Sequence, residues 1–394
     1  MKTVGIIAEY NPFHNGHKFH IDKTKNILKN DYTICIMSGN FIQRGLPALY
    51  NKWIRTQMAL NSGVDLVIEL PVYYAVNSAE YFARYCIKIF NSIGCINNMS
   101  FGTEHDNLED LYNICNVLLK QPTQYVKELK LQLSQGITYA KANELAIVKT
   151  LNDSKYTKIL QNPNNILAIE YIKSLISTNS TVEPFNVIRT CNYNDDTIFS
   201  NICSATAIRN ALQQNHTNEL SNVVPSYTYE LMNTNWPTFL SKFSAQIIFS
   251  LRKMSLEEIE NILEITEGLE IRLKKYSFET NDINELINLV KTKRFTQTKI
   301  QRILIHILLG MTKTEFNEIE KNNLMYIRVL GTNSKGKEIL KKIKENTNVP
   351  IITSVKKYID MYGSNPLLDK DILSSNIYCE KYNIDMTTKL ITNK

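Results

Sequence analysis

The first hundred residues alternate between short apolar runs, typical of buried strands, and longer amphipathic stretches, typical of helices. The apolar runs occupy residues 4–8, 32–37, 65–70 and 96–101, and the helical patterns occupy residues 17–28, 52–60 and 78–93. Strand, helix and strand in succession are typical of a parallel sheet with right-handed crossovers. The sequence therefore predicts an α/β fold with a Rossmann-like parallel sheet.

A change of pattern divides the chain of 394 residues, which is long enough for two domains. Helical patterns dominate residues 108–173, a last strand is expected at residues 183–190, and a helix opens near Ser204. Beyond a polar stretch, helical patterns follow at residues 239–251, 255–263, 281–290 and 299–309, and residues 349–352 could add a small strand. We expect an α/β domain over residues 1–215 and a mainly α-helical domain over residues 216–394.

Composition limits the classes of protein that need to be considered. The formal net charge of +7 suits a polyanionic partner without requiring one. Seven cysteines are scattered without a C-x-x-C pair, which argues against a disulfide framework or a zinc ribbon. The apolar run at residues 4–8 is far too short for a signal peptide or a membrane span. We expect a cytoplasmic protein with no membrane partner, and the sequence does not predict its oligomeric state.

The polar residues that follow the first predicted strand form the most informative motif. Residues 5–17 read G-I-I-A-E-Y-N-P-F-H-N-G-H, which is a strand, a turn and the start of a helix. Ligands of parallel α/β sheets bind beyond the carboxyl ends of the strands, where helix N-termini favour anions. Gly16 permits close backbone approach, and His14 and His17 can converge on phosphate oxygens. The motif predicts a triphosphate site that acts by positioning and electrostatics.

Two simpler interpretations of these histidines remain open. An H-x-x-H pair can bind zinc, with His20 and Glu9 close in sequence, although no full set of ligands is visible. The two histidines could also be incidental surface residues. We expect no dedicated metal site.

The motif H-N-G-H after a strand resembles the H-x-G-H motif of the nucleotidylyltransferase superfamily, which shares its core fold with class I aminoacyl-tRNA synthetases. More of the chain resembles one family, the bacterial tRNA(Met) cytidine acetate ligases. The resemblance covers most of the chain and includes residues 8–17, 38–45, 100–102, 163–167, 204–209, 291–296 and 300–302.

This resemblance implies an activity and a set of ATP-binding residues. It implies that acetate is activated with ATP to acetyl-adenylate, and that the acetyl group passes to N4 of the wobble cytidine of elongator tRNA(Met). The catalytic residues would be His14 and His17. The ATP-binding residues would be Ile7, Ala8, Glu9, Tyr10, Asn11, Pro12, Phe13, His14, Asn15, Gly16, His17, Lys18, Phe19, His20, Gly102, Asn164 and Arg189. Mg²⁺ would arrive with the ATP phosphates.

Several further residues have both a functional and a structural interpretation. Ser204, Thr206 and Arg209 at the start of a helix could bind outer phosphates or cap the helix. Asn165 could contact the nucleotide or cap a helix, and His105 is interpreted as a loop histidine. The loop at residues 38–45, with Lys52 and Arg55 after it, could cover the acetate pocket, receive the cytidine or simply form a turn.

Basic residues of the second half supply the expected surface for tRNA, because a polyanion requires positive charge and an unpaired base requires stacking groups. The expected tRNA-binding residues are Arg272, Lys274, Lys275, Lys291, Lys293, Arg294, Lys299 and Arg302, and they occur beside Tyr276 and Phe295. Lys335 and Lys337 lie in a further positive loop near Arg328. The rival interpretations are an adenylyltransferase that acts on a phosphorylated metabolite and a non-catalytic nucleotide- or RNA-binding protein.

Overall fold

The computed structural model describes residues 1–189, 203–214, 216, 219–266 and 268–393, and the chain forms two compact units. Unit 1 comprises residues 1–7, 14–34 and 79–225, and unit 2 comprises residues 8–13, 35–78 and 226–394. The units are thus interleaved along the chain, whereas the sequence pattern predicted one division at residue 215, a position outside the described residues.

Within unit 1, the strands β1 (Thr3–Ala8), β6 (Asn98–Thr103) and β7 (Glu183–Ile188) pair in parallel in that order. The strand residues Val4, Ile6 and Met99 are buried, as expected for a sheet covered by helices. A Cβ atom on Gly5 would lie 2.5 Å from the ring of Phe90, so only glycine allows such close packing here. The predicted parallel α/β architecture is confirmed.

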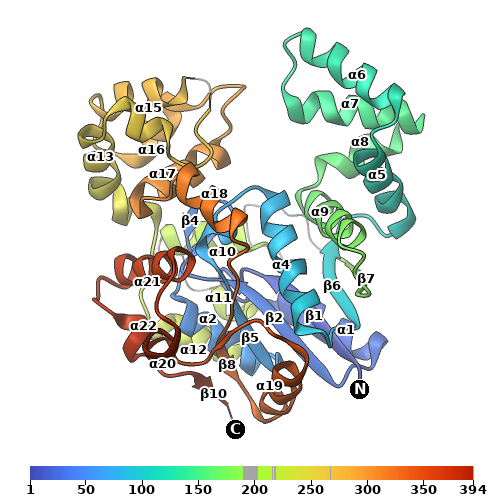
Figure 1. Cartoon of the computed structure of the whole chain (residues 1–394), viewed down its shortest axis with the longest axis vertical. Coiled ribbons are helices and arrows are strands. Elements are labelled where there is room, and N and C mark those ends of the chain that lie inside the picture. Colours follow the sequence, from blue (N-terminus) through green and yellow to red (C-terminus); the bar gives the residue numbers. More distant parts are fainter. Residues whose placement is uncertain (190–202, 215, 217–218, 267, 394) are drawn as a thin grey trace. The chain divides into compact units, whose positions relative to one another are not determined.

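The helices of unit 1 come from three parts of its sequence and are labelled in Figure 1. Helix α4 buries Phe82, Cys86, Ile89 and Ile93 along one face, the spacing expected of an amphipathic helix. Both α4 and α5 pack on α9, and α6 packs on α7. These helices are α1 (Asn15–Leu28), α4 (Ala79–Ile93), α5 (Leu108–Lys120), α6 (Thr123–Ser134), α7 (Tyr139–Leu151), α8 (Lys155–Gln161), α9 (Pro163–Ser177), α10 (Ala205–Gln213) and α11 (Leu220–Val223).

The strands of unit 2 come from both halves of the chain. Strand β2 (Tyr32–Ser38) runs from unit 1 into unit 2, and β3 (Phe41–Ile42) pairs with β4 (Leu46–Pro47) as a short hairpin. Strand β5 (Leu66–Leu70) is antiparallel to β8 (Ile327–Thr332), and β8 also pairs in parallel with β9 (Ile351–Ile352) and β10 (Ile391–Thr392). The mainly helical character predicted for the second half is confirmed, and the small strand suggested at residues 349–352 corresponds to β9. Strand β8, which pairs with a strand of the first half, was not predicted.

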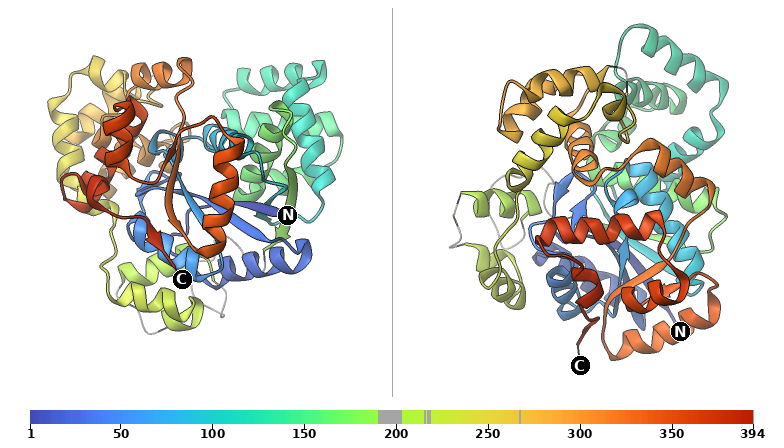
Figure 2. Two further views of the ribbon diagram at one scale, coloured as in Figure 1. Left: turned by 60° about the horizontal axis from the view of Figure 1, so that its bottom comes forward. Right: turned by 60° about the vertical axis from the view of Figure 1, so that its left-hand side comes forward.

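The helices of unit 2 include a cluster of α13, α15, α16 and α17, which lie together in Figures 1 and 2. Among the described residues, no helix has both the length and the apolar character needed to cross a membrane. The helices are α2 (Lys52–Asn61), α3 (Val72–Ala75), α12 (Ser226–Asn233), the 3₁₀ helix η1 (Leu240–Phe243), α13 (Ser244–Lys253), α14 (Leu256–Glu260), α15 (Leu269–Ser277), α16 (Ile283–Val290), α17 (Gln297–Leu309), α18 (Lys313–Lys321), α19 (Ser334–Asn346), α20 (Val355–Tyr362), α21 (Pro366–Cys379) and α22 (Ile384–Thr387).

Candidate functional site

Helix α1 begins with a reciprocal cap made by two histidines. His14 has an extended backbone, and its Nδ1 accepts the Gly16 N–H at 3.1 Å. The Nδ1 of His17 accepts the His14 N–H at 3.3 Å. The arrangement is a capping box in which histidines replace the more usual Ser and Glu. The two rings consequently stack, with centroids 3.7 Å apart and planes 26° apart.

These hydrogen bonds determine the tautomers of both rings. Because each Nδ1 accepts a backbone N–H, the proton of each neutral ring must be on Nε2. Burial lowers the pKa of His14 to about 3, and the nearby charges of Arg189 and Arg209 add to the effect. Burial also lowers the pKa of His17 well below its ordinary value, with further contributions from His14 and Arg189. The pair therefore presents two neutral N–H donors at pH 7.

Arg189 lies beside Gly102 at the carboxyl ends of β6 and β7. Its backbone N–H bonds to the Thr103 carbonyl at 2.9 Å, and a Cβ on Gly102 would lie 3.4 Å from its Cγ. The Nε atom is buried and has no hydrogen-bond partner within the part of the chain that the structure describes. A buried guanidinium donor is costly to leave unbonded, so an anionic ligand fits this position.

The start of α10 brings a second arginine close to His14. Ser204 caps this helix by accepting the Ala207 N–H at 3.0 Å, and Arg209 donates to Thr206 Oγ1 at 2.7 Å. The Arg209 charge is near enough to lower the pKa of His14. The site in unit 1 thus combines two histidines with two arginines, and Ser204 has the structural role of a helix cap.

Asn164 and Asn165, the two asparagines considered for the ATP site, both bond to Glu104. The sequence did not single out this glutamate. Asn164 Nδ2 donates to the Glu104 carboxylate, which also accepts the Asn165 N–H at 3.2 Å. Asn165 is buried, and its Oδ1 accepts the N–H groups of Glu104 and His105 at 3.0 and 3.2 Å. Asn165 therefore fixes the loop after β6 to the start of α9. His105 pairs with Asp110 at 2.8 Å, which accounts for it structurally.

Several other predicted ATP-binding side chains of α1 form contacts with other residues of the protein. His20 Nε2 lies 2.8 Å from Ser100 Oγ, which links α1 to β6. Lys18 pairs with Asp22, Asn15 Nδ2 donates to the Asn222 carbonyl at 2.9 Å, and Lys23 lies over the ring of Phe19 at 5.5 Å. These contacts set the position of α1. Contact of these side chains with a nucleotide stays a prediction.

The turn between β1 and α1 belongs to unit 2, and most of its side chains face the protein interior. Tyr10, Asn11 and Phe13 are at most 3% exposed, and the rings of Tyr10 and Phe13 lie 4.8 Å apart. Pro12 is also buried and follows a cis peptide bond. Residues 10–13 therefore present little side-chain surface and shape the backbone of the turn, while Ile7, Ala8 and Glu9 are partly exposed.

Lys52 and Arg55, the two cations after the loop at residues 38–45, are both fully buried. Lys52 pairs with Glu69 at 2.9 Å and with Asp385 at 3.1 Å. Arg55 donates to the backbone carbonyls of Tyr50, Glu9, Ser38 and Gly39. Their contacts are therefore with the protein itself, and Lys52 and Arg55 are not surface groups that receive a cytidine.

The eight basic residues expected to bind tRNA separate into two groups. Arg272 donates to the Val290 carbonyl, Lys274 donates to three carbonyls at the end of α13, Lys299 donates to Thr266, and Arg302 forms a bidentate pair with Glu264. These four support the packing of α13–α17. The other four are exposed: Lys275, Lys291, Lys293 and Arg294.

We expect the His14→Asn variant to lose less stability than the wild-type protein as the pH falls. Because burial lowers the folded-state pKa of His14 to about 3, the unfolded chain binds more protons below the unfolded pKa of about 6.5. The neutral ring therefore contributes fully above pH 6.5, and this contribution is lost as the pH falls toward 3, at up to about 1.4 kcal/mol per pH unit. Urea unfolding of both proteins between pH 7.5 and 4.5 measures the difference, since Asn retains the cap without titrating. Parallel curves would contradict the neutral state.

Comparison with known proteins shows a matching family and several similar enzymes. The profile of the HIGH Nucleotidyl Transferase family matches residues 1–392. A tRNA(Met) cytidine acetate ligase of Thermoanaerobacter sp. (strain X514) is 44% identical over 97% of this chain and 96% of its own length. The enzyme of that name from Clostridium perfringens (strain ATCC 13124) is 39% identical over 96% of this chain and 95% of its own.

Solved structures of TmcAL are also similar to this chain along its whole length. Apo TmcAL of Thermotoga maritima superposes with a TM-score of 0.94 at 29% identity, covering 100% of this chain and 99% of that one. TmcAL of that organism bound to alpha-thio ATP superposes with a TM-score of 0.92, also at 29% identity and with the same coverage.

Proposed function

Because the chain belongs to the tRNA(Met) cytidine acetate ligase family of HIGH nucleotidyl transferases, we propose that it activates acetate with ATP and acetylates elongator tRNA(Met). The product is N4-acetylcytidine at the wobble position, and the reaction takes place in the cytoplasm. The family resemblance noted from the sequence is confirmed by relatives of about 40% identity along nearly the whole chain.

The main observation in favour of an ATP site is the pair of neutral histidines beside Arg189. A carboxylate oxygen of acetate attacks the α-phosphorus, the bond from that phosphorus to the β-bridging oxygen breaks, and pyrophosphate leaves. The Nε2–H donors of His14 and His17 and the unbonded Nε–H of Arg189 can bind the phosphate oxygens as their charge grows. The protein supplies positioning and hydrogen bonds, with no covalent enzyme intermediate.

Acetyl transfer follows on the same adenylate. The N4 amine of the cytidine attacks the acetyl carbon, the bond to the AMP oxygen breaks, and the amine releases a proton to solvent. Mg²⁺ enters with the triphosphate, whose oxygens are hard ligands that Mg²⁺ prefers. Among the described residues, no group of three or more His, Cys, Asp or Glu side chains is arranged to hold a metal ion.

Further ATP contacts come from the remaining residues of the predicted set. Gly102 gives the backbone close access to the nucleotide, Asn164 approaches from the start of α9, and residues 7–13 wrap around it. Arg209 lies near His14 and reaches the outer phosphates. Ser204 and Thr206 act through the position of Arg209 and the N-terminus of α10.

We expect the double variant Lys293→Ala/Arg294→Ala to weaken tRNA binding without changing acetate activation. Both side chains are exposed in the loop before α17, where each phosphate contact contributes to the salt dependence of binding. The variant should lower tRNA affinity about 10-fold at moderate salt and reduce the slope of log K against log salt by about 2. Lys356→Ala/Lys357→Ala, which removes two exposed cations of α20, is the matched control. Equal effects of both pairs would reject a specific contact in favour of net charge alone.

The decisive experiment is acetate-dependent ATP–pyrophosphate exchange by the purified protein, followed by transfer of labelled acetate to tRNA. Exchange together with transfer to elongator tRNA(Met) is expected. Exchange without any tRNA transfer would reject the tRNA substrate. ATP binding without exchange for any carboxylate would favour an adenylyltransferase for a phosphorylated metabolite or a non-catalytic nucleotide-binding protein.

A further inference from the structure

Arg55 is a completely buried arginine whose hydrogen bonds all go to backbone carbonyls of unit 2. Its Nη1 donates to the Glu9 carbonyl at 2.6 Å, and its Nε donates to the Tyr50 carbonyl at 2.9 Å. Its Nη2 donates to the carbonyls of Ser38, at 3.0 Å, and Gly39. One planar group therefore connects the turn after β1 with both ends of the loop that joins β2 to α2.

Burial lowers the pKa of Arg55 to about 10, so the side chain keeps its charge at neutral pH. A buried charge has a large desolvation cost unless it is fully hydrogen bonded. Four carbonyl oxygens supply that bonding, and a lysine ammonium could not reach all of them because it has no rigid planar fork. The site therefore specifies arginine.

Two more hydrogen bonds attach the loop after β2 to the same turn. Gln43 donates its backbone N–H to Glu9 Oε1 at 2.8 Å, and Leu49 donates its backbone N–H to Asn11 Oδ1 at 2.6 Å. Between these anchors, Tyr10 has a φ of 47°, in the left-handed region that side chains other than glycine rarely adopt. Such a conformation persists only where its surroundings hold it.

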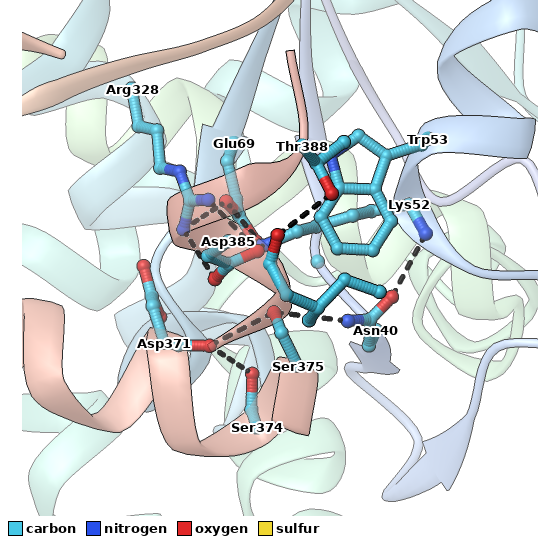
Figure 3. Close-up of polar contacts among 12 residues, drawn as sticks. Asn40, Lys52, Trp53, Glu69, Arg328, Asp371, Ser374, Ser375, Asp385 and Thr388 are labelled. Atoms are coloured by element: carbon cyan, nitrogen blue, oxygen red, sulfur yellow. Dashed lines mark hydrogen bonds and ion pairs between the residues drawn. The ribbon is translucent and has the colours of Figure 1, made fainter. Parts of the chain in front are cut away.

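The loop is itself fixed to helix α21 of unit 2 (Figure 3). Asn40 accepts the Lys52 N–H at 2.9 Å and donates to Ser375 of α21 at 3.2 Å. A Cβ on Gly39 would lie 2.5 Å from Glu69 Oε1, so this backbone approaches a carboxylate that is held by two cations. The carbonyls that Arg55 binds are consequently set by rigid surroundings.

We propose that Arg55 is a positioning residue for ATP activation, which holds residues 9–11 in the conformation that wraps the nucleotide. The proposal rests on the proposed function, because residues 7–13 act on ATP only if the chain is such a ligase. Arg55 touches no substrate. It acts through the Glu9 carbonyl, and the loop at residues 38–50 serves as the support of the ATP-binding turn.

The test compares Arg55→Lys with Arg252→Lys in the full-length protein. Arg252 also donates to backbone carbonyls, those of Ser277 and Thr280, but it lies in the α13–α15 region of unit 2 and does not bond to residues 9–13. For each variant, the ATP dissociation constant, the ATP KM and kcat of exchange, and the unfolding midpoint are measured. Arg55→Lys should weaken ATP binding and lower kcat/KM for ATP by about 10- to 100-fold, whereas tRNA affinity should not change. Arg252→Lys should lower the unfolding midpoint only.

Each outcome decides the matter. Wild-type ATP affinity and exchange in Arg55→Lys, or losses in both variants that simply follow their unfolding midpoints, would overturn the proposal. If Arg55→Lys does not fold, Asn40→Ala, which releases the same loop from Ser375 and leaves residues 7–13 unchanged, carries the same expectation. ATP affinity is measured without acetate or tRNA, so failure of the ligase assignment appears separately, as wild-type protein that binds ATP without exchange.

Discussion

His17→Ala should lower acetate-dependent ATP–pyrophosphate exchange by at least about 10²–10³-fold, the loss typical of removing one preorganised donor to a developing charge. This loss follows from the role proposed for His17, in which Nδ1 accepts the His14 N–H and Nε2–H donates to a phosphate oxygen. The decrease should appear mainly in kcat, because charge on the phosphate oxygens grows in the transition state. Exchange measured over a range of ATP concentrations separates kcat from KM.

The structural contribution of the same side chain needs its own control. His17 is the third residue of α1 and closes the capping box with His14. His17→Ala therefore also removes an acceptor that stabilises α1 by about 1 kcal/mol. His17→Gln retains a standard capping partner and loses the imidazole Nε2–H. We expect His17→Gln to restore the unfolding midpoint while exchange stays well below the wild-type rate. Recovery of both quantities would show that the stacked histidines serve only as a helix cap.

The parts of the site that the sequence predicted are those that local chain geometry determines. His14 and His17 come together because a strand, a turn and a helix N-terminus follow one another within fifteen residues. Arg189 was placed correctly at a strand end, since its apolar strand β7 is continuous in the sequence. The α/β class followed from the alternation of patterns in the same way, whereas nucleotide contact by individual residues stays a prediction.

The features that the sequence did not predict depend on pairing between distant segments. Strand β8 is short and includes Arg328, which reads as an exposed or loop residue until its buried partners Glu69 and Asp385 are known. Glu104 receives a role only when α9 brings Asn164 to it from sixty residues away. Lys52 and Arg55 read as surface cations for the same reason, although both are completely buried. No local period or motif encodes such contacts.

The buried ion cluster of unit 2 contains more acidic than basic groups (Figure 3). Lys52 and Arg328 face Glu69 and Asp385 at 2.9–3.1 Å, and Asp371 lies within electrostatic range of Glu69 and Arg328. Burial and Glu69 raise the pKa of Asp371 to about 7. The raised pKa of Asp371 reduces the excess of negative charge near neutral pH, and the ion pairs join β5, α2, β8 and α22.

Lys52→Met should therefore destabilise the protein by about 3–5 kcal/mol, the cost of leaving a buried charge without its partner. The variant leaves Arg328 as the one cation beside the three carboxyls, so the folded-state pKa of Asp385, which Arg328 and Lys52 hold below its ordinary value, should rise. A raised pKa gives stability that is present at low pH and lost as the pH rises through it, so the deficit should shrink between pH 8 and 6. Urea unfolding at both pH values measures this, and Lys52→Met/Glu69→Gln, which restores the charge balance, should recover part of the loss. A deficit independent of pH, or a double variant no more stable than the single one, would mean that Lys52 contributes through packing against Trp53, whose ring lies 5.0 Å from its Nζ, and not through charge balance.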